Sequence, residues 1–283
     1  MQIRTVGVIG AGTMGNGIAQ VCAMAGLQVI MQDVSEAALN RGMANISKSL
    51  DKLGHKQALD EDSRQATLQR ILCSTNKQAL ADSDLVIEAA TEAEALKLKI
   101  LADIGQVLPE HALIASNTSS LSITTLATAS GRPDRFIGMH FFNPVPVMAL
   151  VELIRGLQTS DETQAMAAAF VAQIHKTAIC ARNSPGFAVN RILVPMINEA
   201  VFVLQEGLAS AQDIDDGMRL GCSHPIGPLA LADLIGLDTL LSVMQMLHEG
   251  FNDSKYRPAA LLRELVDAGY LGRKSGRGFF RYG

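Results

Sequence analysis

The chain has 283 residues, of which 48% are hydrophobic and 18% are charged, and its formal net charge is −4. This length is enough for two domains, and the composition is that of an ordinary folded protein. The weak negative charge and the absence of tryptophan disfavour nucleic-acid binding, and nothing in the composition indicates a membrane surface. We therefore predict neither kind of partner.

The amino-terminal residues and the cysteines indicate the compartment. Residues 1–4 run directly into an apolar strand without the pattern of a secretory leader, and no apolar run reaches the ~18 residues of a membrane span. The cysteines are far apart and form no CxxC pair; they are Cys22, Cys73, Cys180 and Cys222. This spacing predicts neither a zinc site nor a disulfide framework. We expect reduced thiols, no metal and a cytoplasmic location.

The first two thirds of the chain alternate apolar strands with longer helical patterns. Strands are expected over residues 6–9, 28–31, 85–87, 112–115 and 136–139, and helices over residues 14–25, 35–53, 94–108 and 121–128. Such alternation predicts βαβ units in an α/β, Rossmann-type doubly wound parallel sheet with helices on both faces. Residues 36–70 hold two helical stretches with no strand between them, which predicts a helical hairpin inserted off the sheet.

The pattern changes at Ser184. Before it, two further strands are expected over residues 148–154 and 177–180, with a helix over residues 161–174 between them. After it, every pattern is helical, over residues 187–206, 210–220, 238–249 and 258–268. We predict an α/β domain over residues 1–183 and an all-helical C-terminal domain over residues 184–283.

A glycine-rich loop, Gly10-Ala11-Gly12-Thr13-Met14-Gly15, follows the first strand and opens the first helix. Gly10 permits the tight turn, Gly12 lets the backbone approach a pyrophosphate, and Gly15 lets the helix pack on the sheet. Asp33 ends the second strand, where a carboxylate accepts the adenosine ribose hydroxyls and repels the 2′-phosphate of NADP. The loop predicts an NAD site, although a tight turn beside a surface aspartate gives the same pattern.

Polar residues in strand and turn contexts are candidates for chemistry. The segment 116–120, which contains Asn117 and Ser119, follows a strand at the carboxyl edge where such sheets bind ligands, although hydroxyls there also serve as helix caps. His140 ends a buried strand and suits proton transfer near neutral pH, but a histidine there is by itself more often a core side chain.

Two further residues extend this set. Glu152 lies in an apolar strand, where a lone carboxylate needs a partner. Two strands meeting around the turn at Asn143 would bring Glu152 to His140 and fix the imidazole tautomer, whereas an edge-strand glutamate would face water. Asn190 begins the helical domain, where it either faces a site or makes an ordinary interhelical hydrogen bond.

Several segments together resemble the 3-hydroxyacyl-CoA dehydrogenase family over the whole length, and most of all its bacterial 3-hydroxybutyryl-CoA branch. They are residues 10–20 (GAGTMGNGIAQ), 114–121 (IASNTSSL), 132–147 (RPDRFIGMHFFNPVPV), 184–191 (SPGFAVNR) and 272–279 (GRKSGRGF). The resemblance implies that His140 is the general base, that Glu152 orients it, and that Ser119 and Asn190 hydrogen-bond the substrate.

The resemblance also implies the ligand contacts. The NAD-contacting positions are Gly10, Gly12, Thr13, Met14, Gly15, Asp33, Glu92, Lys97, Asn117, Asn143 and Lys274. Ser49 and Lys56, in the helical hairpin, match positions that contact CoA. The hairpin would thereby serve the substrate, although a solvated loop lysine is the simpler interpretation of Lys56.

The implied activity is the NAD-dependent, reversible oxidation of an (S)-3-hydroxyacyl-CoA, in particular 3-hydroxybutanoyl-CoA, to a 3-oxoacyl-CoA such as acetoacetyl-CoA. The family also implies a role in fatty-acid metabolism and a homodimer formed through the C-terminal domain. Two alternatives stay open: a non-catalytic NAD-binding structural or regulatory protein on the same fold, and a different hydroxyacid dehydrogenase. The second would carry a lysine catalyst in the helical domain, where this chain has Asn190.

Overall fold

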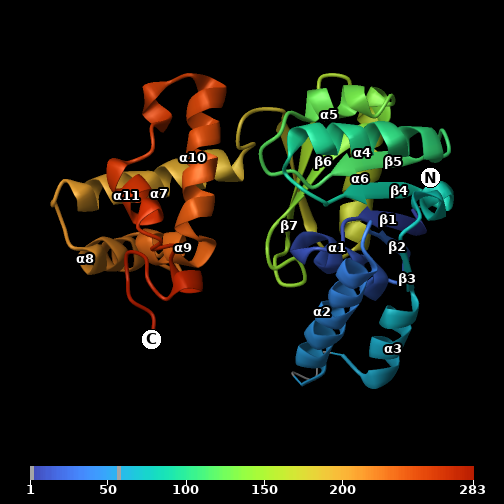
Figure 1. Cartoon of the computed structure of the whole chain (residues 1–283), viewed down its shortest axis with the longest axis horizontal. Coiled ribbons are helices and arrows are strands. Elements are labelled where there is room, and N and C mark those ends of the chain that lie inside the picture. The colour runs from blue at the N-terminus through green and yellow to red at the C-terminus, as the bar shows by residue number, and fades with distance from the viewer. Residues whose placement is uncertain (1–2, 56–58) are drawn as a thin grey trace. The chain divides into compact units, whose positions relative to one another are not determined.

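The structure is a computed structural model that describes residues 3–55 and 59–283. The chain divides into two compact units, Met1–Asn183 and Ser184–Gly283. The first unit combines strands and helices, and the second is built almost entirely from helices (Figure 1). Each unit buries its own cluster of apolar side chains. These features confirm the predicted fold class, a Rossmann-type α/β unit followed by helices.

The described strands of the first unit form one eight-stranded sheet in the order β3-β2-β1-β4-β5-β6-β7-β8. They are β1 (Thr5–Ile9), β2 (Gln28–Gln32), β3 (Ile71–Ser74), β4 (Leu85–Glu88), β5 (Leu113–Ser116), β6 (Phe136–Phe141), β7 (Leu150–Arg155) and β8 (Thr177–Arg182). The expected parallel arrangement ends at β6, because β7 runs antiparallel to β6 and β8 runs parallel to β7. The loop over residues 142–149 is too short for a crossover helix, so the chain reverses there.

Two helical layers cover the sheet. The helices of this unit are α1 (Thr13–Met24), α2 (Glu36–His55), α3 (Glu61–Gln69), α4 (Glu94–Val107), α5 (Ile123–Ala129) and α6 (Asp161–Gln173). Alternate strand side chains, among them Val8, Ile87 and Met139, share a core with α1, α2 and α6. The other set faces α4 and α5, which lie together on the opposite side of the sheet (Figure 1). Both faces are therefore buried, as the near-continuous apolar strands predict.

The hairpin predicted over residues 36–70 consists of α2 and α3. Arg64 of α3 donates to Asp51 Oδ1 and to Ser47 Oγ of α2, each at 2.8 Å. The carboxylate of Asp60 caps α3 by accepting from the Ser63 amide at 2.7 Å. β3 follows at once and was not predicted, because only the first of its four residues is fully buried and no apolar run marks it.

The second unit contains α7 (Val189–Gln205), α8 (Ala211–Asp216), α9 (Pro228–Ile235), α10 (Leu237–Phe251) and α11 (Ala260–Asp267). Among the described helices none is by itself long and apolar enough to span a bilayer, whereas α9 and α10 taken together meet that length and composition across a 99° bend. Buried Asp233 of α9 accepts from the amides of Phe279 and Phe280 and from the Tyr282 hydroxyl, each at 2.9 Å. These bonds hold the end of the chain on α9. Burial, together with the Asp233 carboxylate, raises the pKa of Tyr282 to about 12.

Candidate active site

The loop between β1 and α1 has the shape that a dinucleotide requires. Gly10 has a φ of +97°, a backbone conformation that favours glycine. A Cβ on Gly15 would lie 1.8 Å from the Gly10 carbonyl oxygen, so only glycine lets the helix pack this closely. Gly12 is exposed, and no described heavy atom beyond its chain neighbours lies within 4 Å of where its Cβ would be. Thr13 and Met14 form the first turn of α1, whose amide groups can meet a phosphate there.

Asp33 lies beside this loop at the end of β2. Its Oδ2 accepts from the Ala11 amide at 2.9 Å, and its Oδ1 accepts from the Ser35 amide at 3.1 Å. A cavity of about 390 Å³ opens next to it, lined by Ile9, Gly10, Gln32, Asp33, Val34, Lys77, Ala90, Thr91, Leu96, Ile100, Asp103 and Ile104. Two of its polar residues, Lys77 and Asp103, pair with each other at 2.9 Å. The mostly apolar wall with the Asp33 carboxylate beside the glycine loop fits the adenosine half of NAD. The residues present thus fit the predicted cofactor.

His140 and Glu152 form a buried pair on the neighbouring part of the sheet. Each lies directly opposite the other in the antiparallel pairing of β6 and β7, so their side chains leave the same face. His140 Nδ1 lies 2.7 Å from Glu152 Oε2, and the two residues are 7% and 0% exposed. The ring of Phe142 packs against the imidazole, with centroids 4.5 Å apart. The antiparallel turn is what brings together two residues twelve positions apart.

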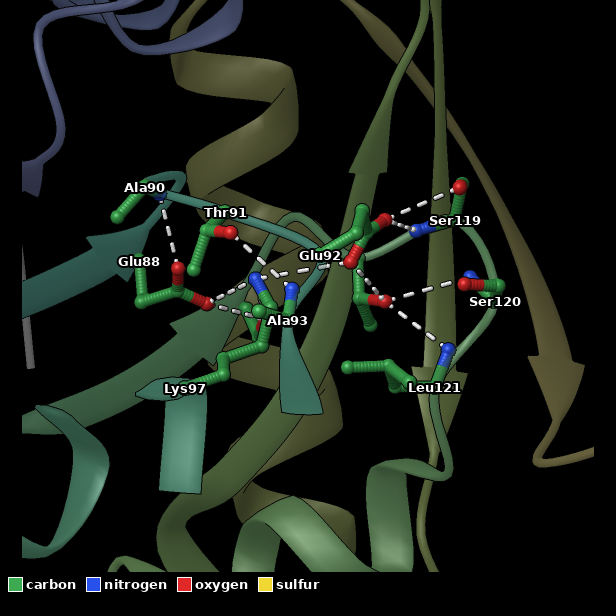
Figure 2. A network of polar contacts seen from close by, with 11 residues as sticks. Glu88, Ala90, Thr91, Glu92, Ala93, Lys97, Ser119, Ser120 and Leu121 are labelled. Carbon is green, nitrogen blue, oxygen red and sulfur yellow. Dashed lines mark hydrogen bonds and ion pairs between the residues drawn. The ribbon is translucent and has the colours of Figure 1, made fainter. Parts of the chain in front are cut away.

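Ser119 lies in the loop that follows β5, where Glu92 holds it (Figure 2). Glu92 Oε1 accepts from the Ser119 amide at 2.7 Å and from its hydroxyl at 3.0 Å. Its Oε2 accepts from Thr118 Oγ1 at 2.9 Å. Asn117 Oδ1 accepts from the Phe141 amide at 2.9 Å, which ties this loop to the residue after His140. The predicted hydroxyl-rich segment is thus fastened to both neighbouring strands.

Lys97 of α4 is 1% exposed, and its ammonium lies against Glu88 rather than at the surface. Lys97 Nζ is 2.5 Å from Glu88 Oε2 and 3.8 Å from Glu92 Oε2. Ser116 Oγ donates to the same Glu88 oxygen at 2.7 Å. The sequence analysis missed Glu88. Its one signal is a carboxylate at the carboxyl end of an apolar strand, Leu85-Val86-Ile87-Glu88.

The loop that joins β6 to β7 carries Asn143, which is exposed and precedes a cis peptide bond to Pro144. Lys176 fixes this loop by donating to the carbonyls of Val145 and Met148 at 2.7 and 2.6 Å. Burial lowers the pKa of Lys176, with Cys22 acting in the opposite direction. Lys176 is a second residue that sequence reasoning missed, because a lysine after a helix gives no signal of what it contacts.

Comparison with known proteins identifies the family. Residues 5–184 match the model of the 3-hydroxyacyl-CoA dehydrogenase NAD binding domain, and residues 186–282 match the model of the C-terminal domain of the same family. The chain belongs to the 3-hydroxyacyl-CoA dehydrogenase family. This result confirms the resemblance found in the sequence and the prediction of an NAD-binding domain.

Individual relatives extend this comparison over whole chains. The chain is 53% identical to a 3-hydroxybutyryl-CoA dehydrogenase of Bradyrhizobium diazoefficiens, over 99% of this chain and 96% of that one. It is 49% identical to a probable 3-hydroxybutyryl-CoA dehydrogenase of Bacillus subtilis, over 100% and 98% of the two chains. The solved structure of (S)-3-hydroxybutyryl-CoA dehydrogenase PaaH1 from Ralstonia eutropha matches with a TM-score of 0.97 at 62% identity, covering 100% of each chain.

The structure describes three of the four remaining predicted residues. Asn190 is half-buried in the first turn of α7, in the second unit. Lys274 is also in the second unit, where its ammonium contacts both oxygens of Asp238 at 2.5 and 2.6 Å. Ser49 is half-buried on α2, and Lys56 lies outside the described residues.

Within residues 3–55 and 59–283, no three His, Cys, Asp or Glu side chains gather in a way that would hold a metal ion.

Proposed function

We propose that this chain catalyses the NAD-dependent, reversible oxidation of (S)-3-hydroxyacyl-CoA to 3-oxoacyl-CoA, with 3-hydroxybutanoyl-CoA and acetoacetyl-CoA as its short-chain pair. The buried His140–Glu152 pair at the carboxyl end of β6 carries the proposal, because oxidising a hydroxyl requires an oriented base. The names of the relatives in Bradyrhizobium diazoefficiens and Ralstonia eutropha support the choice of a short acyl chain.

The pair provides proton transfer at a defined nitrogen. When Nδ1 donates to the Glu152 carboxylate, the neutral imidazole of His140 carries its lone pair on Nε2. Nε2 takes the proton of the substrate hydroxyl, and Glu152 stabilises the imidazolium that results. The glycine loop and Asp33 would hold NAD, which would supply the acceptor for the hydride that leaves C3 of the substrate. In the direction of reduction, the imidazolium returns its proton to the carbonyl oxygen.

Ser119 and Asn190 position the oxygens of the substrate in this proposal. Glu92 supports the role of Ser119, because it accepts from both the amide and the hydroxyl of that residue and so fixes its place. Fixing the reacting groups in a productive geometry is an orientation effect, which reduces the entropy lost on the way to the transition state.

For the cofactor, we assign the glycine loop with Thr13 and Met14 to the pyrophosphate and Asp33 to the adenosine ribose. Glu92, Asn117, Asn143 and Lys274 are assigned to the remainder of NAD. Lys97 contributes by holding Glu92 in place, since its own ammonium is buried against Glu88. The pocket beside Asp33 and the open face of Gly12 support the first two assignments.

The hairpin helix α2 is assigned to CoA. Ser49 and Lys56 remain the proposed contacts. Their setting supports this, because exposed Lys48 and Lys52 lie one helical turn apart on α2, opposite the face that buries Ile46. Cationic side chains at this spacing suit the phosphates of CoA.

We also assign the chain to a cytoplasmic homodimer in fatty-acid metabolism, formed through residues 184–283. Exposed apolar side chains of that unit support the dimer; they include Ile192 at 72%, Leu208 at 76%, Leu220 at 81% and Leu234 at 54%. The four cysteines are free thiols, which suits a reducing compartment. Sedimentation of the purified protein over a range of concentrations tests the dimer, and a monomer at every concentration would refute it.

One assay tests the activity: NADH oxidation with 3-oxoacyl-CoA substrates of four to ten carbons, with 2-oxo acids as the comparison. We expect turnover that is fastest with acetoacetyl-CoA. His140→Ala should lower kcat by about 100- to 10,000-fold, the usual worth of a general base, with little change in NADH affinity. Binding of NADH without any turnover would instead favour the structural or regulatory alternative, and turnover of 2-oxo acids alone would favour another dehydrogenase class.

A further inference from the structure

A second charged cluster lies on the same face of the sheet as His140. Glu88 and Ser116 are register partners on β4 and β5, and Ser116 in turn pairs with Gly138 on β6. His140 lies two residues beyond Gly138 on the same strand, about 7 Å farther along. The cluster and the His140–Glu152 pair are therefore neighbours at the carboxyl edge of one sheet.

Every side-chain oxygen of Glu88 has a defined partner (Figure 2). Oε1 accepts from the Ala90 amide at 2.9 Å, and Oε2 accepts from Ser116 Oγ at 2.7 Å and from Lys97 Nζ at 2.5 Å. Glu88 and Ser116 are 0% exposed, and Lys97 is 1% exposed. A charged pair in such dry surroundings is held tightly, because either charge alone would be strongly disfavoured there.

Lys97 also contacts Glu92, a residue outside the buried pair. Its ammonium is also 3.8 Å from Glu92 Oε2, and the Glu92 side chain is 47% exposed. A half-exposed carboxylate on a loop ordinarily samples several rotamers. Here the Glu92 carboxylate contacts the Lys97 ammonium as well as the Ser119 amide and hydroxyl. The contacts thus run in one line from Glu88 through Lys97 and Glu92 to Ser119 (Figure 2).

We propose that Glu88 is a positioning residue for the reaction: through Lys97 and Glu92 it holds the Ser119 hydroxyl in place for the substrate oxygen. This inference rests on the proposed function, since Ser119 is assigned to the substrate there. Glu88 touches neither substrate nor cofactor. Its carboxylate holds the Lys97 ammonium in place inside the fold, and the Lys97 ammonium keeps Glu92 turned toward Ser119.

A coupling experiment separates positioning from a merely structural role. Glu88→Gln alone would leave a buried ammonium without its counter-charge, so we combine it with Lys97→Met, which removes both charges and keeps similar volumes. We expect the double variant to keep a wild-type melting temperature but to lose about tenfold in kcat with acetoacetyl-CoA at saturating NADH, a typical cost of slight misplacement. Asp216→Asn/Arg219→Met, which removes an exposed pair 3.0 Å apart in the second unit, is the matched control and should change nothing.

The decisive measurement combines these changes with Ser119→Ala. If Glu88 acts through Ser119, the tenfold loss should disappear in the Ser119→Ala background, because residues of one network are non-additive. A loss of the same size in both backgrounds would overturn the proposal, and so would a double variant with wild-type kcat. A wild-type protein that reduces no 3-oxoacyl-CoA would instead refute the proposed function.

A milder variant covers the case in which the double variant does not fold. Ser116→Ala removes one hydroxyl donor from Glu88 and leaves both charges in place. We expect a two- to threefold loss in kcat, about a third to a half of the effect of removing the pair on a logarithmic scale, and none in the Ser119→Ala background. An equal loss in both backgrounds would again overturn the proposal.

Discussion

Two buried pairs lie on one face of the sheet, and they differ in the nitrogen group that meets the carboxylate, an imidazole in one and an ammonium in the other. His140 and Glu152 are 2.7 Å apart on β6 and β7, while Lys97 and Glu88 are 2.5 Å apart between α4 and β4. Each pair has a carboxylate with 0% exposure. An imidazole has two ring nitrogens, one of which can donate while the other accepts, whereas an ammonium can only donate.

This difference matches the two tasks proposed for the pairs. A base must exist in both protonation states during one turnover, and the 7% exposure of His140 leaves its ring a path to a substrate. A positioning group needs fixed contacts, and Lys97 is 1% exposed with its ammonium against Glu88. One sheet thus holds both pairs, the proposed base on β6 and β7 and the proposed positioning group on β4 and α4.

Glu152→Gln tests the His140–Glu152 pair and should have the largest effect. The amide nitrogen of glutamine can donate to Nδ1 of His140, which moves the lone pair to the wrong nitrogen, and it cannot stabilise the imidazolium. We expect kcat for acetoacetyl-CoA reduction to fall by about 1,000- to 10,000-fold, as in the analogous change within a Ser-His-Asp triad. NADH affinity and melting temperature serve as controls. A kcat within tenfold of wild type would show that His140 needs no charged partner.

Asp33 adds a third carboxylate, which is neither buried nor paired with a cation in the described contacts. We expect its charge to repel the 2′-phosphate of NADPH. The kcat/KM for NADH should therefore exceed that for NADPH by about 100-fold or more, since a like charge costs several kcal/mol. Asp33→Asn should reduce the preference about tenfold by removing the charge, which is worth ~1.4 kcal/mol. Steady-state kinetics with both cofactors decide this. Equal rates in the wild type would contradict the assignment of Asp33.

Much of the first unit was predictable because its signals are local. The apolar strands, the glycine loop and the acid at Asp33 follow from spacing alone, and each is in the expected place in the structure. The contact of His140 with Glu152 required one further step, the idea that two strands meet around the turn at Asn143. The reversal of β7 and β8 follows from the same turn, although the alternation of strands and helices favours a parallel sheet.

The contacts that sequence reasoning missed are between residues far apart. Glu88, Lys97 and Ser116 come from β4, α4 and β5, and only the packing of α4 on the sheet makes them one cluster. Lys176 contacts the carbonyls of Val145 and Met148, which lie 31 and 28 residues away in the sequence. Single residues of these types have no pattern of their own, so their partners emerge only once the chain is folded.

Exposed charges should behave differently from both buried pairs, and α2 offers the test. Lys48→Ala/Lys52→Ala removes two exposed cations near the proposed CoA contacts. We expect KM for acetoacetyl-CoA to rise up to about tenfold at low salt with kcat unchanged, because each exposed pair contributes ~0.2–1 kcal/mol. The effect should shrink as salt is added. Arg4→Ala, an exposed cation before the first strand, is the control. A salt-independent change in kcat would point to damage of the fold instead.

Lys274 and Asp238 form an exposed pair in the second unit and should show the smallest effect. Burial alone would raise the pKa of Asp238, but the Lys274 ammonium and the Thr239 amide hold it below the usual value. A lowered carboxyl pKa stabilises the fold above the usual carboxyl pKa, and this contribution is lost as the pH falls through the lowered value. Lys274→Met should therefore cost at most ~1 kcal/mol of unfolding free energy at neutral pH and nothing in acid.

Urea unfolding at neutral and acid pH measures the contribution of this pair, and KM for NADH measures the proposed cofactor contact of Lys274. A rise in KM with little loss of stability would support that contact, because solvent screens the ion pair while a bound phosphate or ribose would still lose its donor. An unchanged KM would leave Lys274 as a partner of Asp238 only. In either case the stability that this exposed pair contributes at neutral pH should be lost in acid.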